Sequence, residues 1–351
     1  MKVDDHHYRS IWLEDNAPSV SVIDQTLLPF EFRIRQLRST ADMVDAIATM
    51  VVRGAPLIGA AAACGLFLAA QENPSDEHLE KSASRLLTAR PTAVNLRWAL
   101  DRMLPELLNE PITQRVEAAR VGAQKICDED VSINSRIGAH GLEFLTQHCH
   151  LAQKDMPFNI LTHCNAGWLA TVDWGTALSP IFKAHDAGMN IHVWVDETRP
   201  RNQGALLTAW ELKAHGVPHT VIADNAGGHL MQRGQVDACI VGSDRTTRSG
   251  DVCNKIGTYL KALAAKANDV PFFAALPSST IDWSIRDGIS EIPIEERESI
   301  EVTHITGADE KNQLVRVRLT PEGSQAANPA FDVTPRDYVS GIITERGVCD
   351  A

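Results

Sequence analysis

The chain has 351 residues, of which 44% are hydrophobic, 22% charged and 5% aromatic, as in globular proteins of one large or two ordinary domains. Its 45 acidic residues outnumber 33 Lys and Arg residues and give a formal net charge of -12, which excludes a broad basic surface for nucleic acid or anionic membrane. An anionic ligand therefore needs a local cluster of basic side chains and backbone amides.

The amino terminus and the cysteine pattern indicate the compartment. The first residues, MKVDDHHYRS, are polar and lack the basic flank and apolar core of a secretory signal, so we expect a cytoplasmic protein without a membrane partner. Seven cysteines, an odd number with no Cys-x-x-Cys pair, predict reduced thiols and no zinc framework. The uncharged run 54–71 contains Pro56 and many alanines, which favours a buried helix over a membrane span.

The first third of the chain is predicted to be mainly helical. A short β region at 19–34 precedes a series of helical patterns of apolar residues. These patterns span residues 40–52, 57–70, 82–90, 95–108 and 112–126. The segment 127–149 connects this region to the rest. The predicted division is a mainly helical amino-terminal domain with a short β region at 1–130 and a catalytic domain at 131–351.

From about Met156 the pattern changes to short β-rich runs that alternate with helical stretches, which is typical of a parallel sheet with right-handed crossovers. The predicted strands span residues 159–163, 190–195, 219–223, 238–241 and 272–275. We therefore predict an α/β fold in which a Rossmann-like parallel sheet follows the helical domain. No Gly-x-Gly-x-x-Gly and no Walker-type loop follows these strands, so the sheet need not bind a nucleotide cofactor.

Four of these apolar runs end in a reactive or acidic residue. The four residues are Cys164, Asp196, Asp224 and Asp244. Ligands of open parallel sheets bind outside the carboxyl ends of the strands, so we expect these side chains at one crevice.

Cys164 and Asp244 are the candidates for chemistry. A thiol at the edge of a crevice can be a nucleophile, a base or a donor, and a carboxyl group leaving an apolar strand can act as a general acid if burial raises its pKa. The alternatives are a small apolar core residue for Cys164 and a capping or loop carboxylate for Asp244. His163, next to the thiol, is predicted to point to the opposite face of the strand and to be structural.

Basic residues near helix starts supply a candidate anion site. The segment VVRGAPLIG places residues 53–55 at the start of the alanine-rich helix, where exposed amides favour an anion. Arg53 can bind phosphate through two parallel hydrogen bonds. Arg90 adds a second cation, and Lys255, predicted to open another helix together with Asn254, adds a third. The alternative for each is a solvated surface charge, because sequence alone does not show convergence.

Nine long segments of the chain are distinctive: VVRGAPLIG, RPTAVNLRWA, LTHCNAG, VDETRPRNQGALLTAWEL, DNAGGHLM, GSDRTTRSGDVCNKIGTY, EIPIEERE, EVTHITG and NPAFDVTP. In these segments the chain resembles the methylthioribose-1-phosphate isomerases, sugar isomerases of methionine salvage that share their fold with regulatory subunits of translation initiation factor 2B. The resemblance covers nearly the whole chain and is far more specific than a fold-level analogy, which by itself would not indicate a reaction.

This resemblance implies a homodimer with no metal or organic cofactor and a small sugar phosphate as its ligand. It implies that Cys164 and Asp244 form the catalytic pair. It also implies substrate contacts at Arg53, Gly54, Ala55, Arg90, Gln203, Asn254 and Lys255. Two departures from the family pattern, the glycines in DNAGGHLM and the serine in GSDR, remove no catalytic group but can reshape the pocket.

The implied reaction converts 5-methylthioribose 1-phosphate to 5-methylthioribulose 1-phosphate. The phosphate on the anomeric oxygen blocks simple ring opening, so we expect Asp244 to protonate the ring oxygen and Cys164 to act near C2 as a base or as a stabiliser of developing charge. Transfer of the hydrogen as a proton or as a hydride stays open.

Two alternative functions are also considered. One is the isomerisation of a related compound such as 5-deoxyribose 1-phosphate or ribose 1,5-bisphosphate. The other is a non-catalytic, translation-factor-like regulatory subunit, which the presence of Cys164 and Asp244 argues against.

Overall fold

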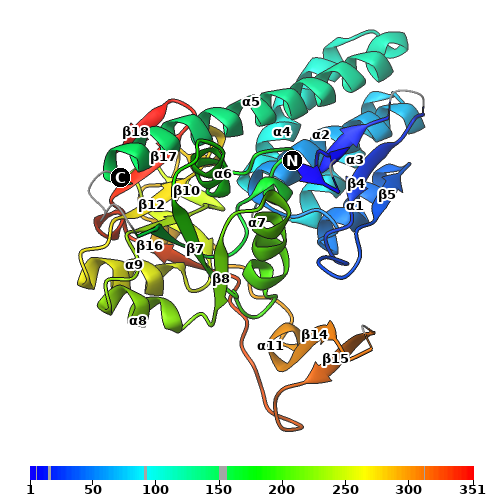
Figure 1. The fold of residues 1–351 in the computed structure, drawn as a ribbon. Coiled ribbons are helices and arrows are strands. Elements are labelled where there is room, and N and C mark those ends of the chain that lie inside the picture. Colours follow the sequence, from blue (N-terminus) through cyan, green and yellow to red (C-terminus); the bar gives the residue numbers. More distant parts are fainter. Residues whose placement is uncertain (5, 15–16, 91–92, 150–155, 312) are drawn as a thin grey trace.

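The computed structural model describes residues 1–351 except 5, 15–16, 91–92, 150–155 and 312. Residues 91 and 92 of the RPTAVNLRWA segment therefore lie outside the described residues. Figure 1 shows a helical part with a small sheet, in blue and cyan, and a larger sheet flanked by helices, mainly in green, yellow and red. The predicted fold class is confirmed: the protein is an α/β protein with a largely parallel sheet and a helical amino-terminal region.

The amino-terminal region combines short strands with five helices. β1 (Lys2–Val3) pairs with β2 (His6–His7), and a three-stranded antiparallel sheet follows. That sheet contains β3 (Ile11–Leu13), β4 (Val20–Ile23) and β5 (Ile34–Leu37). The helices are α1 (Thr40–Ala48), α2 (Ala55–Glu72), α3 (Asp76–Ala89), α4 (Val94–Asn109) and α5 (Arg115–Cys149). Every predicted helical segment falls on one of them.

Helix α2 is the central element of this region. Its N-cap residue, Gly54, has φ +97, and a Cβ there would lie 2.5 Å from the backbone of Ala170, so the start of the helix requires glycine. By length and composition α2 could cross a membrane, but 83% of its apolar window is buried inside the protein. It is therefore a core helix, as predicted from its alanine content and Pro56.

Helix α5 runs for 35 residues and joins the two parts of the molecule. Ala119, Ala123 and Cys127 belong to the apolar core around α2, whereas Ile137 and Leu145 belong to the core beneath the large sheet. The predicted boundary at 130/131 lies between these two sets, inside the helix. The division into two domains stays a prediction.

The large sheet has seven strands in the order β18-β17-β12-β9-β6-β7-β8, and only the β17–β18 pair is antiparallel. Its strands are β6 (Phe158–Thr162), β7 (Ile191–Asp196), β8 (His219–Ile222), β9 (Ala238–Val241), β12 (Phe272–Ala275), β17 (Gly341–Thr344) and β18 (Gly347–Cys349). The five predicted strands are confirmed to within one residue at each end. The last two strands were not predicted.

Helices and one π-helical turn connect the strands of this sheet. The helices are α6 (Leu178–Asp186), α7 (Ala209–His215), α8 (Ala226–Gln232) and α9 (Thr258–Ala267), and the π-helical turn is Gly204–Thr208. Short 3-10 segments lie at Ile112–Gln114, Trp168–Ala170, Ser278–Thr280 and Arg336–Tyr338. All six cysteines with described side chains are free thiols.

A second, four-stranded sheet lies beside the carboxyl ends of the first and was not predicted. It is ordered β13-β10-β11-β16. Its strands are β10 (Arg245–Thr247), β11 (Val252–Lys255), β13 (Ile281–Asp282) and β16 (Phe331–Thr334). Between β13 and β16 come α10 (Gly288–Glu291), α11 (Ile300–Thr303) and the hairpin β14 (His304–Ala308) and β15 (Leu314–Arg318). Figure 1 shows this hairpin projecting from the body of the molecule.

The prediction that Asn254 and Lys255 open a helix is wrong. Both lie in β11, paired with Asp332 and Phe331 of β16. Gly257, with φ +100, then turns the chain, and α9 begins one residue later. The first half of β11 pairs with the nearby β10, but Asn254 and Lys255 pair with β16, about 80 residues away in the sequence, which no local pattern indicates.

Candidate active site

The order of the parallel strands places a crevice between β6 and β9. If the six parallel strands are numbered in chain order (β6, β7, β8, β9, β12, β17), the sheet reads 3-2-1-4-5-6, the order of doubly wound dinucleotide-binding sheets. The connections reverse direction between the first and fourth strands, which are β6 and β9. Cys164 follows β6 and Asp244 follows β9, so both lie at the switch point where such folds bind ligands.

Cys164 is buried and held in an unusual backbone conformation. Its φ is 67°, in the left-handed region that costs a non-glycine residue about 1–3 kcal/mol and that recurs at functional sites. Its amide donates to Oγ1 of Thr198 (2.8 Å), and its carbonyl accepts from Oγ1 of Thr208 (2.7 Å). The thiol donates to Oε1 of Gln203 across 3.6 Å. The two threonines therefore hold a strained turn that presents the thiol to Gln203.

Arg53 is fixed beside the thiol through Asn165. Its guanidinium donates to Oδ1 (2.5 Å) and to the carbonyl (2.8 Å) of Asn165, while its Nε has no partner among the described residues. The amide of Asn165 donates to Glu211, which also accepts from two backbone amides. Burial raises the pKa of Glu211 to about 7, against the lowering effect of these bonds. This network leaves one donor of Arg53 available to a ligand.

Asp244, Lys255 and Cys164 affect one another's ionisation. Burial raises the pKa of Asp244, and the charges of Lys255, Arg53 and Arg90 only partly oppose this effect. Burial likewise raises the pKa of Cys164, opposed by Arg53 and Lys255, and lowers the pKa of Lys255. Burial therefore favours a protonated carboxyl group and a neutral thiol at this site.

Lys255 is held over an aromatic ring at the edge of the site. Its Nζ donates to the carbonyl of Ala330 (2.9 Å) and lies 4.5 Å from the centre of the Phe331 ring. Asn254 points differently, since its amide donates to Oγ1 of Thr258. Lys255 therefore acts on Cys164 and Asp244 through its charge. Asn254 instead stabilises the turn after β11.

Arg90 reaches the site from the end of α3 and pairs with a carboxylate from far along the chain. Its Nη2 lies 3.2 Å from Oε2 of Glu295, and its Nε has no partner in the part of the chain that the structure describes. Glu295 also pairs with Arg297, which pairs with Glu301, and Glu301 with Arg201. This chain of ion pairs connects Arg90 with Arg201 through the segment 295–301.

Two small cavities flank Arg53, Gly54 and Ala55. One, of about 30 Å³, has Asp244 and Arg90 in its wall, and its lining is Ala55, Ile58, Arg90, Ala93, Asp244, Arg245, Cys253, Ile292, Pro293 and Phe331. The other, of about 70 Å³, is lined by Gln25, Thr26, Leu28, Met50, Arg53, Arg201, Gln203, Leu206 and Leu207. Arg90 and Asp244 therefore share one cavity, and Arg53 and Gln203 share the other.

Two of the four strand-end residues build the scaffold. Asp224 accepts from the backbone amides of Thr198 and Arg199. Asp196 is fully buried against His163 (2.8 Å) and Lys261 (3.1 Å). Cys164 and Asp244, in contrast, experience the charges of Arg53 and Lys255.

Sequence reasoning did not assign Thr198, Thr208, Asn165 and Glu211, which position the thiol and Arg53, or Glu295, which pairs with Arg90. All five lie inside the family segments quoted above. Thr198 accepts a hydrogen bond from the left-handed residue Cys164 only because the fold brings the loop after β7 next to the loop after β6.

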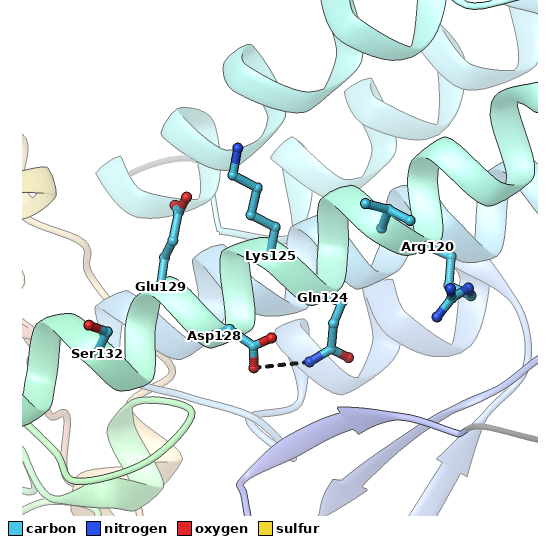
Figure 2. A pocket seen from close by; sticks show the side chains of 7 residues that line it. Arg120, Gln124, Lys125, Asp128, Glu129 and Ser132 are labelled. Carbon is cyan, nitrogen blue, oxygen red and sulfur yellow. Dashed lines mark hydrogen bonds between the residues drawn. The ribbon is translucent and has the colours of Figure 1, made fainter.

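Larger hollows lie elsewhere on the described part of the molecule. One of about 560 Å³ is formed by a single face of α5 and is lined by Arg120, Val121, Gln124, Lys125, Asp128, Glu129 and Ser132 (Figure 2). Gln124 donates to Asp128 there, at 3.0 Å on an exposed surface. These side chains carry no buried charge of the kind found at the switch point, so this hollow is not the candidate active site.

Comparison with known proteins supports the same conclusion as the geometry. The model of the initiation factor 2 subunit family matches residues 51–351. The methylthioribose-1-phosphate isomerase of Gluconobacter oxydans is 60% identical over all of this chain and 96% of its own length, and that of Methylorubrum extorquens is 61% identical with the same coverage. The chain belongs to the methylthioribose-1-phosphate isomerases.

This chain is similar to solved structures of both an isomerase and a translation factor subunit. The 5-methylthioribose 1-phosphate isomerase of Pyrococcus horikoshii OT3 has a TM-score of 0.82 and 43% identity, covering 97% of this chain and 92% of its own. The translation initiation factor eIF-2B subunit delta from A. fulgidus has a TM-score of 0.79 and 40% identity, covering 97% and 96%. The fold therefore does not by itself separate isomerases from factor subunits, and the site must do so.

Proposed function

We propose that the protein is an aldose-ketose isomerase that converts 5-methylthioribose 1-phosphate to 5-methylthioribulose 1-phosphate in methionine salvage. The observation that carries the proposal is the convergence of a thiol, a carboxyl group with a raised pKa and three cations at the sheet's switch point. The full-length similarity to named isomerases supports the same reaction.

The phosphate of the substrate is bound by the two guanidinium groups. Arg53 and Arg90 each keep an Nε without a partner among the described residues, although both side chains are almost fully buried. A buried donor without an acceptor costs about 1–3 kcal/mol, which a bound phosphate oxygen would recover. The amides at Gly54 and Ala55, at the start of α2, add donors to the same anion.

Asp244 supplies the acid. A carboxyl group kept protonated by burial can donate its proton to the ring oxygen as the C1–oxygen bond of the ring breaks, and it becomes a carboxylate beside Lys255. The ammonium group of Lys255 then stabilises the carboxylate that forms at Asp244. Cys164 acts near C2, either as a thiolate that takes the C2 proton and returns it to C1, or by stabilising charge while hydride moves from C2 to C1. In both routes the C2 hydroxyl gives its proton to the Asp244 carboxylate, which restores the acid.

The residues that position the thiol are part of this proposal. Gln203 accepts from the thiol, so it can orient Cys164 toward the sugar. The homodimeric state, the cytoplasmic location and the lack of a metal or organic cofactor remain predictions made together with this function.

A coupled assay with purified protein tests the proposal. We expect the highest kcat/KM with 5-methylthioribose 1-phosphate, and lower values with 5-deoxyribose 1-phosphate and ribose 1,5-bisphosphate. A higher value with either alternative would reassign the substrate. Absence of turnover with all three, in a folded protein, would favour the regulatory-subunit alternative.

A further inference from the structure

His163 lies directly before Cys164, and only 1% of its surface is exposed. Its Nδ1 lies 2.8 Å from Oδ2 of Asp196, and its Nε2 lies 2.8 Å from the backbone carbonyl of Ile256. Ile256 follows Lys255. The imidazole ring therefore joins the residue before the thiol to the residue after the lysine, two groups of the active site that come from different strands.

Both partners of the ring are acceptors. A backbone carbonyl has no proton to donate, so Nε2 must carry one. The same Asp196 oxygen that faces Nδ1 also lies 3.1 Å from Nζ of Lys261, a donor with three protons. That oxygen is therefore the unprotonated oxygen of a carboxylate, and Nδ1 must carry a proton too.

We propose that His163 is a doubly protonated positioning residue that fixes Lys255 relative to Cys164. The catalytic part of this inference rests on the proposed function. The protonation part rests only on the two contacts of the ring.

The charges around the ring are balanced. Asp196 on β7 and Asp332 on β16 are the carboxylates, and Lys261 on α9 is the second cation. Asp224, after β8, has its side chain bonded to the amides of Thr198 and Arg199, and only its carbonyl reaches Lys261. Two cations, His163 and Lys261, thus face two carboxylates, which avoids an unpaired buried charge.

A metal ion does not explain this cluster. Ligand atoms of His163, Asp196 and Asp224 lie within 4.8 Å of one another. The ammonium group of Lys261 already bonds to Asp196 and to the carbonyl of Asp224, in the place a cation would take. The described side chains there are organised around this ammonium group.

The contact with Ile256 restricts the turn that carries Lys255. Gly257 follows with φ +100, and a Cβ at this position would lie 3.0 Å from Cε1 of the histidine, so the ring packs directly on the turn. Asp332 holds the other side of the turn through the amide of Gly257 (2.7 Å). Loss of the ring's Nε2 donor would leave the position of Lys255 less well defined.

Protein labelled with ¹⁵N-histidine tests the protonation state. At about pH 7.5 we expect one ring with two protonated nitrogens and slowly exchanging protons, because both ring nitrogens face acceptors. This signal should be absent from His163→Gln and present in His192→Gln, a control on the same sheet. A neutral tautomer for His163, with Nδ1 unprotonated, would overturn the proposal.

Two variants separate the two bonds of the ring. His163→Gln places an amide donor near the position of Nε2 and can keep the bond to Ile256, whereas His163→Asn can keep only the bond to Asp196. We expect kcat to fall about a hundredfold in His163→Asn, because misplacing a catalytic group by about 1 Å lowers the rate by about that factor. In His163→Gln kcat should fall by no more than about tenfold. KM should change little in both variants.

Equal losses of kcat in the two variants, or a change in KM alone, would show that the bond to Ile256 does not position Lys255. Thermal melting of both variants controls for folding. If the wild-type protein turns over none of the sugar phosphates, the proposed function fails while the labelling experiment still decides the protonation state.

Discussion

The core around α2 and the region around the β6–β9 switch point bury side chains of opposite kinds. Almost every residue from Ala55 to Ala70 is buried and apolar. At the switch point the buried side chains include Arg53, Lys255 and Asp196. Apolar burial stabilises the fold by about 25 cal/mol per Å², whereas a buried ion pair often contributes nothing or destabilises. Stability and activity should therefore depend on different residues.

The largest effect should come from the catalytic pair. Cys164→Ser and Asp244→Asn are each expected to lower kcat by about a hundredfold or more, the contribution of a positioned acid or base. The melting temperature should not fall in Asp244→Asn, because the substitution removes a carboxyl group that burial disfavours in its charged form. A near-normal rate in either variant would remove that residue from the mechanism.

The reverse pattern is expected in the helical core. Leu66→Ala, at a fully buried position, should lower the free energy of unfolding by about 2–5 kcal/mol, measured by urea denaturation. The kcat of the remaining folded enzyme should be unchanged. Leu260→Ala is the matched control, since this leucine is 63% exposed and its loss should change the free energy by about 0.5 kcal/mol or less. A lower kcat in Leu66→Ala would show that the two regions are coupled.

Arg90 should affect substrate affinity more than turnover. Arg90→Ala is expected to raise KM for the sugar phosphate by about tenfold or more, because a hydrogen bond to a charged group contributes about 1.5–3 kcal/mol. Arg85→Ala, at an exposed position of α3, controls for the loss of one positive charge. An unchanged KM in Arg90→Ala would place Arg90 outside the site.

Glu295 should act in the opposite direction with a smaller effect. Glu295→Gln removes the carboxylate that competes with phosphate for Arg90, so we expect the Kd for inorganic phosphate to fall a few-fold, as measured by calorimetry. Glu298→Gln, an exposed neighbour, should leave the Kd unchanged. Weaker phosphate binding in Glu295→Gln would show that Glu295 holds Arg90 in place instead of blocking it.

The smallest effect concerns the junction of the two regions on α5. Burial raises the pKa of Asp130 to about 7, and its Oδ2 accepts from the amide of Val172 (2.7 Å). Because the folded pKa lies above the unfolded value, this group's contribution to stability is present below about pH 4 and is lost as the pH rises through about 7.

Asp130→Asn should therefore reduce the decrease in melting temperature between about pH 5 and pH 8, measured by differential scanning fluorimetry. Asp128→Asn, on an exposed face of the same helix, should not. An identical pH dependence in wild type and Asp130→Asn would show that Asp130 does not retain its proton in the folded protein.

The sequence by itself determined five of the strands of the large sheet, the helical amino-terminal region and the two reactive strand ends. These features depend on residues a few positions apart, because the period of apolar residues and the placement of glycine and proline select helix, strand or turn locally. Cys164 and Asp244 were recognisable because the ends of parallel strands meet at one edge. The family motifs added Gln203, which no local pattern indicates.

Only the tertiary structure decided which charges share the site. Arg90 meets Glu295 across 205 residues of sequence, and Arg53 meets Asn165 across 112. Lys255 pairs with Phe331 of the remote strand β16, so its local sequence was mistaken for the start of a helix. His163 had the appearance of a structural residue because its two acceptors, Asp196 and Ile256, come from other segments. Protonation and affinity depend on such long-range neighbours and on burial, which no local pattern of residues specifies.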